Sequence, residues 1–357
     1  MLLLLSTALA APCLTPEVLA ALNGAAPAPH PHALLAPDHL DGRPRPSATS
    51  KPVYGGNYEF HVDTANFTIN WWDDSIPEST AVAAGEALET AWHSFLVEQG
   101  WPAPVSSDRY LIWVLLDPSL GAATGYTTEY FTDDYPDGYP VIYLNPAWVD
   151  PPEFWSALSA HEFMHTIQFA MRDWQGTETG EQSWYWEASA THSSELADPD
   201  WDGHQYCSEW YAAQPGLRYD SAEGSHQYGM FVFNAWLEED ATGPGGMKAV
   251  WEEGTDRPQD TWDTLISAST GWSVADLWGG FTGAYANESL SESDLYTAVA
   301  TEGTAEDGAQ GTLPYLGTAC LTVARDLRLS VDGDAVLSGP EGPAATVSAR
   351  AGDLVAV

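Results

Sequence analysis

WSALSAHEFMHTIQFAM, residues 155–171, is the stretch that decides the fold of this sequence. It is apolar on every side, and a helix of this kind is normally buried in the core of a protein. Yet its middle carries His161, Glu162 and His165, three side chains that are costly to bury unless they are paired or bind a metal. The stretch therefore predicts a central buried helix with a polar site inside it.

The residues before this stretch mark the start of the helix. Asp150 is a typical N-cap, Pro151 is a typical first helical residue, and Glu153 completes a capping box. We therefore expect the helix to begin at Pro151.

His161 and His165 are four residues apart, so on an α-helix they differ by about 40° in azimuth and about 6 Å in rise. Both rings can face one point, and Glu162 projects beside that face. This is the HExxH pattern, in which two imidazoles bind zinc and the glutamate acts as general base. Two buried histidines can also be satisfied by hydrogen bonds alone, but the carboxylate between them favours a metal ion.

A catalytic zinc site needs a third protein ligand. Gln168 and Met171 stand where the metzincin pattern requires Gly and His, so that class is excluded. Further on, residues 179–198, TGEQSWYWEASATHSSELAD, begin with a capping-box spacing and end before a proline, which predicts a second helix. Glu187 lies on this helix, followed by small residues that permit close packing, and we expect it to be the third ligand. The rival ligands, expected on the solvated side of the helix, are Glu181, His192 and Glu195.

HEFMHTIQFAM followed by WYWEASATHSSE resembles the gluzincin zinc metallopeptidases. The closest likeness is to a group of secreted bacterial metalloproteases with an HExxHxxQ helix and a W-x-E-x-[ST]-A helix, and it spans roughly residues 54–300. The resemblance implies an α+β fold of the zincin-like (thermolysin-like) type. In that fold a mixed sheet, with an edge strand beside the active helix, is followed by a mainly helical lower lobe. The implied edge strand is VIYLN, residues 141–145, which would hydrogen-bond an extended peptide.

The sequence departs from thermolysin around the third ligand. In thermolysin this ligand lies in an N-E-x-x-S-D setting, whereas here Trp186 precedes Glu187 and no aspartate follows at the equivalent place. The residue that orients His161 is therefore not defined by the resemblance.

Peptide hydrolysis also needs a hydrogen-bond donor for the developing oxyanion. SHQYGMFVFNAW, residues 225–236, carries Tyr228 and His226 at the start of an amphipathic helix, and gluzincins commonly supply a Tyr or His from this lobe. We expect Tyr228 as the first candidate donor and His226 as the second. The alternative is that both belong to an aromatic interface beneath the active cleft.

A second motif follows the predicted third-ligand helix. Its acidic residues fit the calcium-loop spacing D-x-D-x-D-G-x5-E, and they are Asp198, Asp200, Asp202 and Glu209, with Gly203 at the turn. Pro199 is unusual in such a loop, and Gln205 replaces the usual aliphatic residue. We therefore favour an ordinary acidic turn, with Ca²⁺ binding as the alternative.

The remaining sequence predicts a sheet, a helical region and a small β appendage. Residues 66–72 and 109–117 are rich in aromatic and branched side chains typical of strands, and residues 81–100 between them are typical of a helix. Residues 125–140 are expected to be a Gly/Pro/Asp/Tyr loop, and helical segments then continue to about residue 300. The domains expected are a zincin-like catalytic domain at 53–310 and a β appendage at 311–357.

The N-terminal residues predict export from the cell. MLLLLSTALA, residues 1–10, has a short apolar core and an A-x-A-like cleavage site typical of a signal peptide. Residues 11–52 are rich in Pro, Ala and His, which indicates a linker or propeptide. Lipidation at Cys13 is a minor alternative, because Pro12 fits a lipoprotein signal badly. We expect a secreted or cell-surface protein without a membrane-spanning segment.

Charge and cysteine content exclude several classes of function. With 51 acidic and 11 basic residues the formal net charge is -40, which repels nucleic acids and anionic lipids. Cys13, Cys207 and Cys320 form no CxxC pair, so no zinc ribbon or thioredoxin-type motif is present. One disulfide plus an odd thiol is expected, with the pairing undefined, and the oligomeric state is undefined as well.

These features predict a secreted zinc metallopeptidase that acts on proteins or peptides. An endopeptidase is the form we expect, although no motif for binding a free α-amine decides between endo and exo action. The alternative is a non-catalytic secreted surface or adhesion protein with a structural zinc, which the 17 Trp and 16 Tyr would suit. Glu162 favours the enzyme, because a structural zinc needs no base and is closed by a fourth protein ligand.

Overall fold

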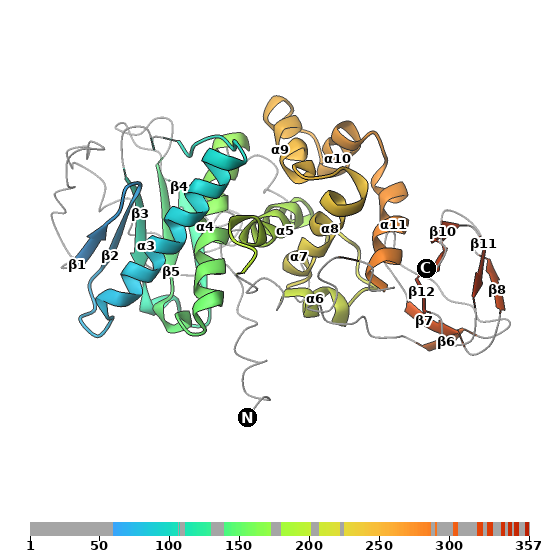
Figure 1. The fold of residues 1–357 in the computed structure, drawn as a ribbon, viewed down its shortest axis with the longest axis horizontal. Helices are drawn as coiled ribbons and strands as arrows, with labels where there is room; N and C mark the ends of the chain where they lie inside the picture. The colour runs from blue at the N-terminus through green and yellow to red at the C-terminus, as the bar shows by residue number, and fades with distance from the viewer. Residues whose placement is uncertain are drawn as a thin grey trace. The chain divides into compact units, whose positions relative to one another are not determined.

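The computed structural model describes most of residues 60–286 and short strands beyond them (Figure 1). The gaps within this range are 106, 108–110, 130–138, 173–179, 201–206 and 222–224. Beyond it, the described residues are Leu290 and the strand segments between 303 and 356. The predicted signal peptide at 1–10 and the predicted linker or propeptide at 11–52 lie outside the described residues.

The chain divides into two compact units. The first comprises Met1–Glu178 and Ala190–His204, and the second comprises Thr179–Ser189 and Gln205–Val357. None of the helices in the part of the chain that the structure describes is long and apolar enough to cross a membrane.

The first unit contains a mixed five-stranded sheet, which confirms the expected α+β class. Its strands are β1 (Phe60–Asp63), β2 (Phe67–Trp71), β3 (Ile112–Leu116), β4 (Gly125–Glu129) and β5 (Pro140–Leu144). The order is β1-β2-β3-β5-β4, with β2, β3 and β5 parallel and the two outer strands antiparallel to their neighbours. All residues of β2, β3 and β5 are buried, as expected for the central strands of a covered sheet.

Two sequence-based expectations about the outer strand were wrong. VIYLN was expected at the sheet edge, but β5 lies between β3 and β4, and β4 is the edge strand. The segment that begins at Gly125 was expected to be loop, because its Gly, Pro and Asp residues are typical of turns. Pairing with β5 stabilises it as a strand, and Tyr126 stacks on its register partner Tyr143 at 4.2 Å between ring centroids.

The apolar stretch at residues 155–171 lies in helix α4 (Pro152–Arg172), which is buried along most of its length as predicted. The helix begins one residue later than expected. Pro151 precedes another proline, which disfavours the helical conformation at Pro151 itself. Its carbonyl still accepts the first helical hydrogen bond, from the Trp155 amide at 3.2 Å. Pro151, rather than Asp150, therefore occupies the N-cap position.

Helix α3 (Glu78–Trp92) and the π-helical turn η2 (His93–Glu98) account for the helix predicted at 81–100. Both α3 and α4 pack against the sheet and against each other (Figure 1). Phe163 of α4 is fully buried, with its ring centroid 5.2 Å from that of Phe67 and 5.7 Å from that of Trp92. Burial of such a side chain stabilises the fold by about 2 kcal/mol. Phe163 therefore fixes its part of α4, and with it the neighbouring site residues.

The second unit is mainly helical. Its described helices include part of α5 (Gly180–Ala197), then α6 (Ser208–Ala213), α7 (His226–Gly229), α8 (Phe231–Trp236), η7 (Leu237–Ala241), α9 (Gly246–Asp256), α10 (Trp262–Thr270) and α11 (Val274–Ala286). Trp251 lies in its aromatic core, 5.0 Å from Trp186 and 4.7 Å from Trp262 between ring centroids. Its indole N–H donates to the Ser189 hydroxyl of α5 at 3.1 Å, which explains why a small residue stands at 189.

The C-terminal strands of the same unit form two small sheets. The strands are β6 (Gly303–Ala305), β7 (Cys320–Val323), β8 (Leu327–Ser330), β9 (Leu337–Gly339), β10 (Gly342–Ala344), β11 (Thr346–Ala349) and β12 (Leu354–Ala356). One sheet has the order β10-β9-β12-β7-β6, and β11 pairs with β8 in the other. Helix α11 packs against β9, β10 and β12. β6 lies before residue 311 and pairs with β7, which lies after it. The larger sheet therefore contains strands from both sides of the predicted domain boundary.

Candidate metal centre

The structure brings together His161 and His165 of α4 and Glu187 of α5. One ligand atom from each residue lies within 4.8 Å of the others, and all three side chains are buried. The two imidazole rings are roughly perpendicular, with centroids 4.8 Å apart, as the four-residue spacing predicts. This group of three can hold a metal ion.

Each imidazole has a polar partner at Nδ1. The Nδ1 of His165 lies 2.7 Å from the side-chain oxygen of Gln168. Because an amide oxygen only accepts, this contact places the His165 proton on Nδ1 and the lone pair on Nε2. The Nδ1 of His161 lies 3.4 Å from the hydroxyl of Thr191. Thr191 follows Glu187 by four residues on α5, where thermolysin has its aspartate, so it supplies the partner that the resemblance left undefined.

Glu162 lies between the two histidines in sequence and is fully buried. Its side-chain Oε2 is 2.7 Å from the hydroxyl of Thr127, and its backbone oxygen is 2.8 Å from the same hydroxyl. Thr127 belongs to the edge strand β4, which packs directly against α4. The carboxylate therefore lies between the helix and the edge of the sheet.

The chemistry of these donors fits zinc. Two imidazole nitrogens and one carboxylate oxygen are a common ligand set of catalytic zinc. Two carboxylates buried together cost several kcal/mol unless a cation compensates them. Among the residues that the structure describes, no further His, Cys, Asp or Glu belongs to the group.

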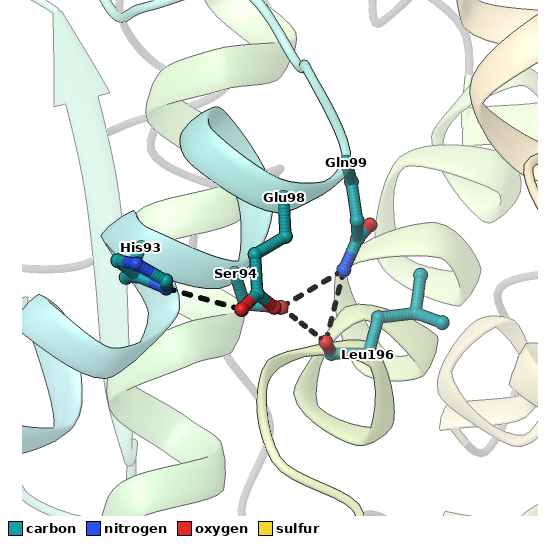
Figure 2. Close-up of polar contacts among 5 residues, drawn as sticks. All are labelled: His93, Ser94, Glu98, Gln99 and Leu196. Carbon is teal, nitrogen blue, oxygen red and sulfur yellow. Dashed lines mark hydrogen bonds and ion pairs between the residues drawn. The ribbon is translucent and has the colours of Figure 1, made fainter.

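The C-terminal end of α5 is hydrogen-bonded to the helical segment beside α4 that consists of α3 and η2. The Leu196 carbonyl, in the last turn of α5, accepts hydrogen bonds from the Ser94 hydroxyl at 2.5 Å and from the Gln99 amide at 2.9 Å (Figure 2). The Gln99 amide also lies 2.9 Å from the Ser94 hydroxyl. Carbonyls in the last turn of a helix have no partner within it, so these two side chains both satisfy the carbonyl and hold α5.

The two candidate oxyanion donors lie on helix α7. Tyr228 and His226 are both buried, with Tyr228 near Trp210 and His226 near Tyr211 at ring-centroid distances of 5.5 and 5.7 Å. Burial lowers the pKa of His226 to about 4, against a weaker opposing effect of a backbone hydrogen bond at Trp210. The ring is therefore neutral at pH 7. These surroundings agree with the aromatic-interface alternative, and the donor role of either residue stays a prediction.

One of the three rival ligands was misplaced by the sequence analysis. His192 was expected on the solvated side of its helix but is 4% exposed, because α5 is covered on nearly all sides. Glu195 is partly exposed, and the side chain of Glu181 lies outside the described part of the structure. Neither His192 nor Glu195 belongs to the metal-binding group of the described residues.

The calcium-loop motif is described only in part. The Asp200 amide donates to the Asp198 side chain at 3.0 Å, which forms a local turn after α5. Glu209 lies in α6, whereas Asp202 and Gly203 are outside the described residues. Calcium binding stays the alternative to the ordinary acidic turn that the sequence favours.

Cys207 forms no disulfide with any residue that the structure describes. Burial raises the pKa of its thiol, and Glu209 and Glu187 raise it further, so the side chain is a neutral thiol at pH 7. Cys13 and the side chain of Cys320 are outside the described residues, and the predicted pairing stays open.

Gln168, Thr191 and Thr127 were not recognised from the sequence as parts of the site. Gln168 carries a local signal, because a residue three positions after His165 lies on the same helix face. Thr191 has the same kind of signal relative to Glu187. Nothing in the sequence links Thr127 to Glu162, since that contact depends on which strand forms the sheet edge.

A comparison with protein families finds that residues 83–284 match a model described as a family of unknown function (DUF6055). This range includes α4 and α5 with all three predicted zinc ligands. Among curated proteins, none matches the chain.

Proposed function

The chain belongs to the DUF6055 family of unknown function, and we propose that it is an exported zinc-dependent peptidase of the gluzincin type. The observation that carries the proposal is the buried group of His161, His165 and Glu187, with Glu162 held beside it against the edge strand. Zinc ligands and a general base are the two components that hydrolysis at such a centre requires.

His161 and His165 would bind zinc through Nε2, since their Nδ1 atoms face Thr191 and Gln168. Glu187 would contribute a carboxylate oxygen. Zinc, when bound, supplies a Lewis acid that polarises the scissile carbonyl and lowers the pKa of water at the site. The burial of all three side chains excludes bulk water, which strengthens their electrostatic interactions.

Glu162 would act as the general base and then as the general acid. Its carboxylate takes a proton from the attacking water while the water oxygen bonds to the carbonyl carbon of the peptide. It then donates that proton to the leaving nitrogen as the C–N bond breaks. Water is thereby divided between a new carboxylate and a new amine, and Glu162 returns to its ionised state.

Strand β4 would position the substrate. One of its sides pairs with β5, and no other strand pairs with it among the described residues. An extended peptide can add to such an edge through backbone hydrogen bonds. A mixed sheet whose edge strand lies against the HExxH helix is the arrangement that the zincin resemblance implies, and it supports the proposal.

Removing the two glutamates separates metal binding from chemistry. Glu162→Gln keeps the shape of the side chain and the zinc ligands, so zinc should stay near one per chain while peptide hydrolysis falls by at least about 10²-fold. Glu187→Ala removes a ligand and should weaken zinc binding and lower the melting temperature. Zinc content by atomic emission and cleavage of casein or a quenched peptide library are the measurements.

Full-length protein and protein trimmed to begin near Lys51 should both be assayed, with and without a chelator. If zinc-loaded wild type cleaves nothing in either form, the peptidase proposal is wrong and the structural-zinc alternative is favoured. If Glu162→Gln loses zinc while Glu187→Ala keeps metal and activity, the two roles are assigned wrongly.

A further inference from the structure

We propose that Thr127 of strand β4 is a positioning residue for Glu162, and that Gly125 on the same strand provides the space in which the carboxylate is held. The inference rests on the proposed function, because it concerns the group assigned there as general base.

The hydrogen bond between Thr127 and Glu162 is the first observation. Both side chains are fully buried, and the Thr127 hydroxyl lies 2.7 Å from Oε2 of the carboxylate and 2.8 Å from the Glu162 backbone oxygen. A hydroxyl has one proton, and the carboxylate oxygen is the nearer of the two acceptors. Thr127 therefore donates to Oε2 and holds one oxygen of the base at the sheet edge.

The missing side chain of Gly125 is the second observation. A Cβ built on Gly125 would lie 2.9 Å from Oε1 of Glu162 and 2.7 Å from the Tyr143 backbone oxygen. Both separations are shorter than the usual contact distance, and the backbone oxygen of a paired strand cannot give way easily. An alanine at this position would therefore push the carboxylate out of its place.

Side chains alternate between the two faces of β4, and this alternation explains both observations. Residues two apart on a strand share a face, so Gly125 and Thr127 both point toward α4. Tyr126 and Thr128 point to the opposite face, where Tyr126 stacks on Tyr143. One face of the edge strand is thus shaped around the Glu162 carboxylate.

Positioning matters because a base acts efficiently only when its oxygen is held within reach of the water it deprotonates. A glutamate side chain has several rotatable bonds, and an unheld carboxylate spends much of its time in unproductive rotamers. A displacement of about 1 Å at a catalytic group can cost about 10²-fold in rate. Loss of the Thr127 hydrogen bond should therefore lower kcat more than it raises KM.

The experiment uses Thr127→Val, which keeps the shape of the side chain but removes the hydroxyl. Thr127→Ser restores the hydroxyl and tests for rescue. Thr128→Val is the matched control, because Thr128 is also fully buried, lies on the same strand, and has no hydrogen bond from its hydroxyl among the described residues. Gly125→Ala tests the space beside the carboxylate independently of the hydroxyl.

Five quantities are measured on each zinc-loaded variant: zinc per chain, melting temperature, kcat and KM on a quenched peptide, and the affinity for acetohydroxamate by calorimetry. Acetohydroxamate chelates zinc and gives its proton to a neighbouring base, so its affinity reports the position of Glu162 without turnover. Thr127→Val should keep about one zinc per chain. Its kcat and its hydroxamate affinity should each fall about tenfold or more, with KM changed less than about threefold.

Thr127→Ser should recover most of what Thr127→Val loses, Gly125→Ala should resemble Thr127→Val, and Thr128→Val should match the wild type. The inference is overturned if Thr127→Val and Thr128→Val behave alike in an active protein, or if Thr127→Ser is as impaired as Thr127→Val. Zinc-loaded wild type that cleaves nothing overturns the proposed function and the inference together. Hydroxamate binding that is equal in all variants overturns the inference alone.

Discussion

His226 is a buried histidine whose ring remains neutral at pH 7, and this has a measurable effect on stability. Its pKa is lowered from 6.5 to about 4, mainly by burial, so the unfolded chain binds a proton at this residue at a higher pH than the folded chain does. Its contribution to stability is therefore complete above pH 6.5. As the pH falls toward 4, that contribution is lost.

Replacing His226 with Gln should remove this pH dependence. Between pH 7.5 and pH 5 the free energy of unfolding of the wild type should fall by about 2 kcal/mol more than that of His226→Gln, since only the wild type has this ring to protonate. Urea unfolding of the zinc-loaded proteins at both pH values measures the difference. Loss of zinc at acidic pH affects both proteins and cancels. An equal fall in both would mean that the His226 ring is solvated.

At the residue scale, the sequence predicted the residues of the metal-binding group better than the residues that support them. His161, Glu162 and His165 could be recognised because one turn of helix sets their mutual geometry, so spacing alone predicts convergence. Glu187 could be recognised because a zinc site requires a further ligand on a nearby helix. Thr127 could not, because its contact with Glu162 depends on strand order, which local patterns do not encode.

At the scale of elements, helix α5 is the part whose attachment matters most for the site. It carries Glu187, and the carbonyl of Leu196 near its C-terminus accepts hydrogen bonds from Ser94 and Gln99 (Figure 2). These bonds fix one end of the helix, and a rigid helix transmits that constraint to the ligand along its length.

Ser94→Ala should loosen this attachment. We expect the free energy of unfolding to fall by about 1 kcal/mol, the usual contribution of a buried hydrogen bond, and zinc affinity to fall a few-fold because Glu187 is held less firmly. Competition with a chromophoric chelator measures the affinity. Thr90→Ala is the control, since its exposed hydroxyl donates to the Glu86 carbonyl within α3 and its loss should leave zinc affinity unchanged. Full zinc affinity in a destabilised Ser94→Ala would show that other contacts hold α5.

The elements with a strong hydrophobic pattern were predicted well, and the edge strand was not. Helices α3 and α4 and strands β2 and β3 have long apolar or periodic stretches whose burial determines their structure. β4 begins with glycine, and its strand structure depends on pairing with β5. The order of the two strands follows from that pairing, which no local pattern in either strand specifies.

At the scale of the whole molecule, the main electrostatic feature is the large negative net charge. The formal charge is -40, and the 11 basic residues can compensate few of the 51 acidic ones. The ion pairs in the described part include Arg218–Asp220 and Lys248–Glu252, both partly exposed, and such pairs contribute little to stability. Repulsion among the carboxylates therefore outweighs their attraction to the basic residues, and it destabilises the compact state.

Salt should therefore stabilise this protein. Raising sodium chloride from 0.1 to 1 M shortens the Debye length from about 10 to about 3 Å, which screens repulsion between separated carboxylates. The melting temperature should rise by several degrees, and potassium chloride at equal ionic strength should produce the same rise. A melting temperature that falls with salt would show that attractive ion pairs dominate instead.

The origin of the ligands from two different helices determines how a bound metal would leave. His161 and His165 come from a single turn of α4, so they are in place whenever that helix is formed. Glu187 is brought to them by α5, which must dock before the third bond can form. The ion would therefore be released only when α5 transiently undocks. The residence time of the metal would then be set by the rate at which this one helix undocks.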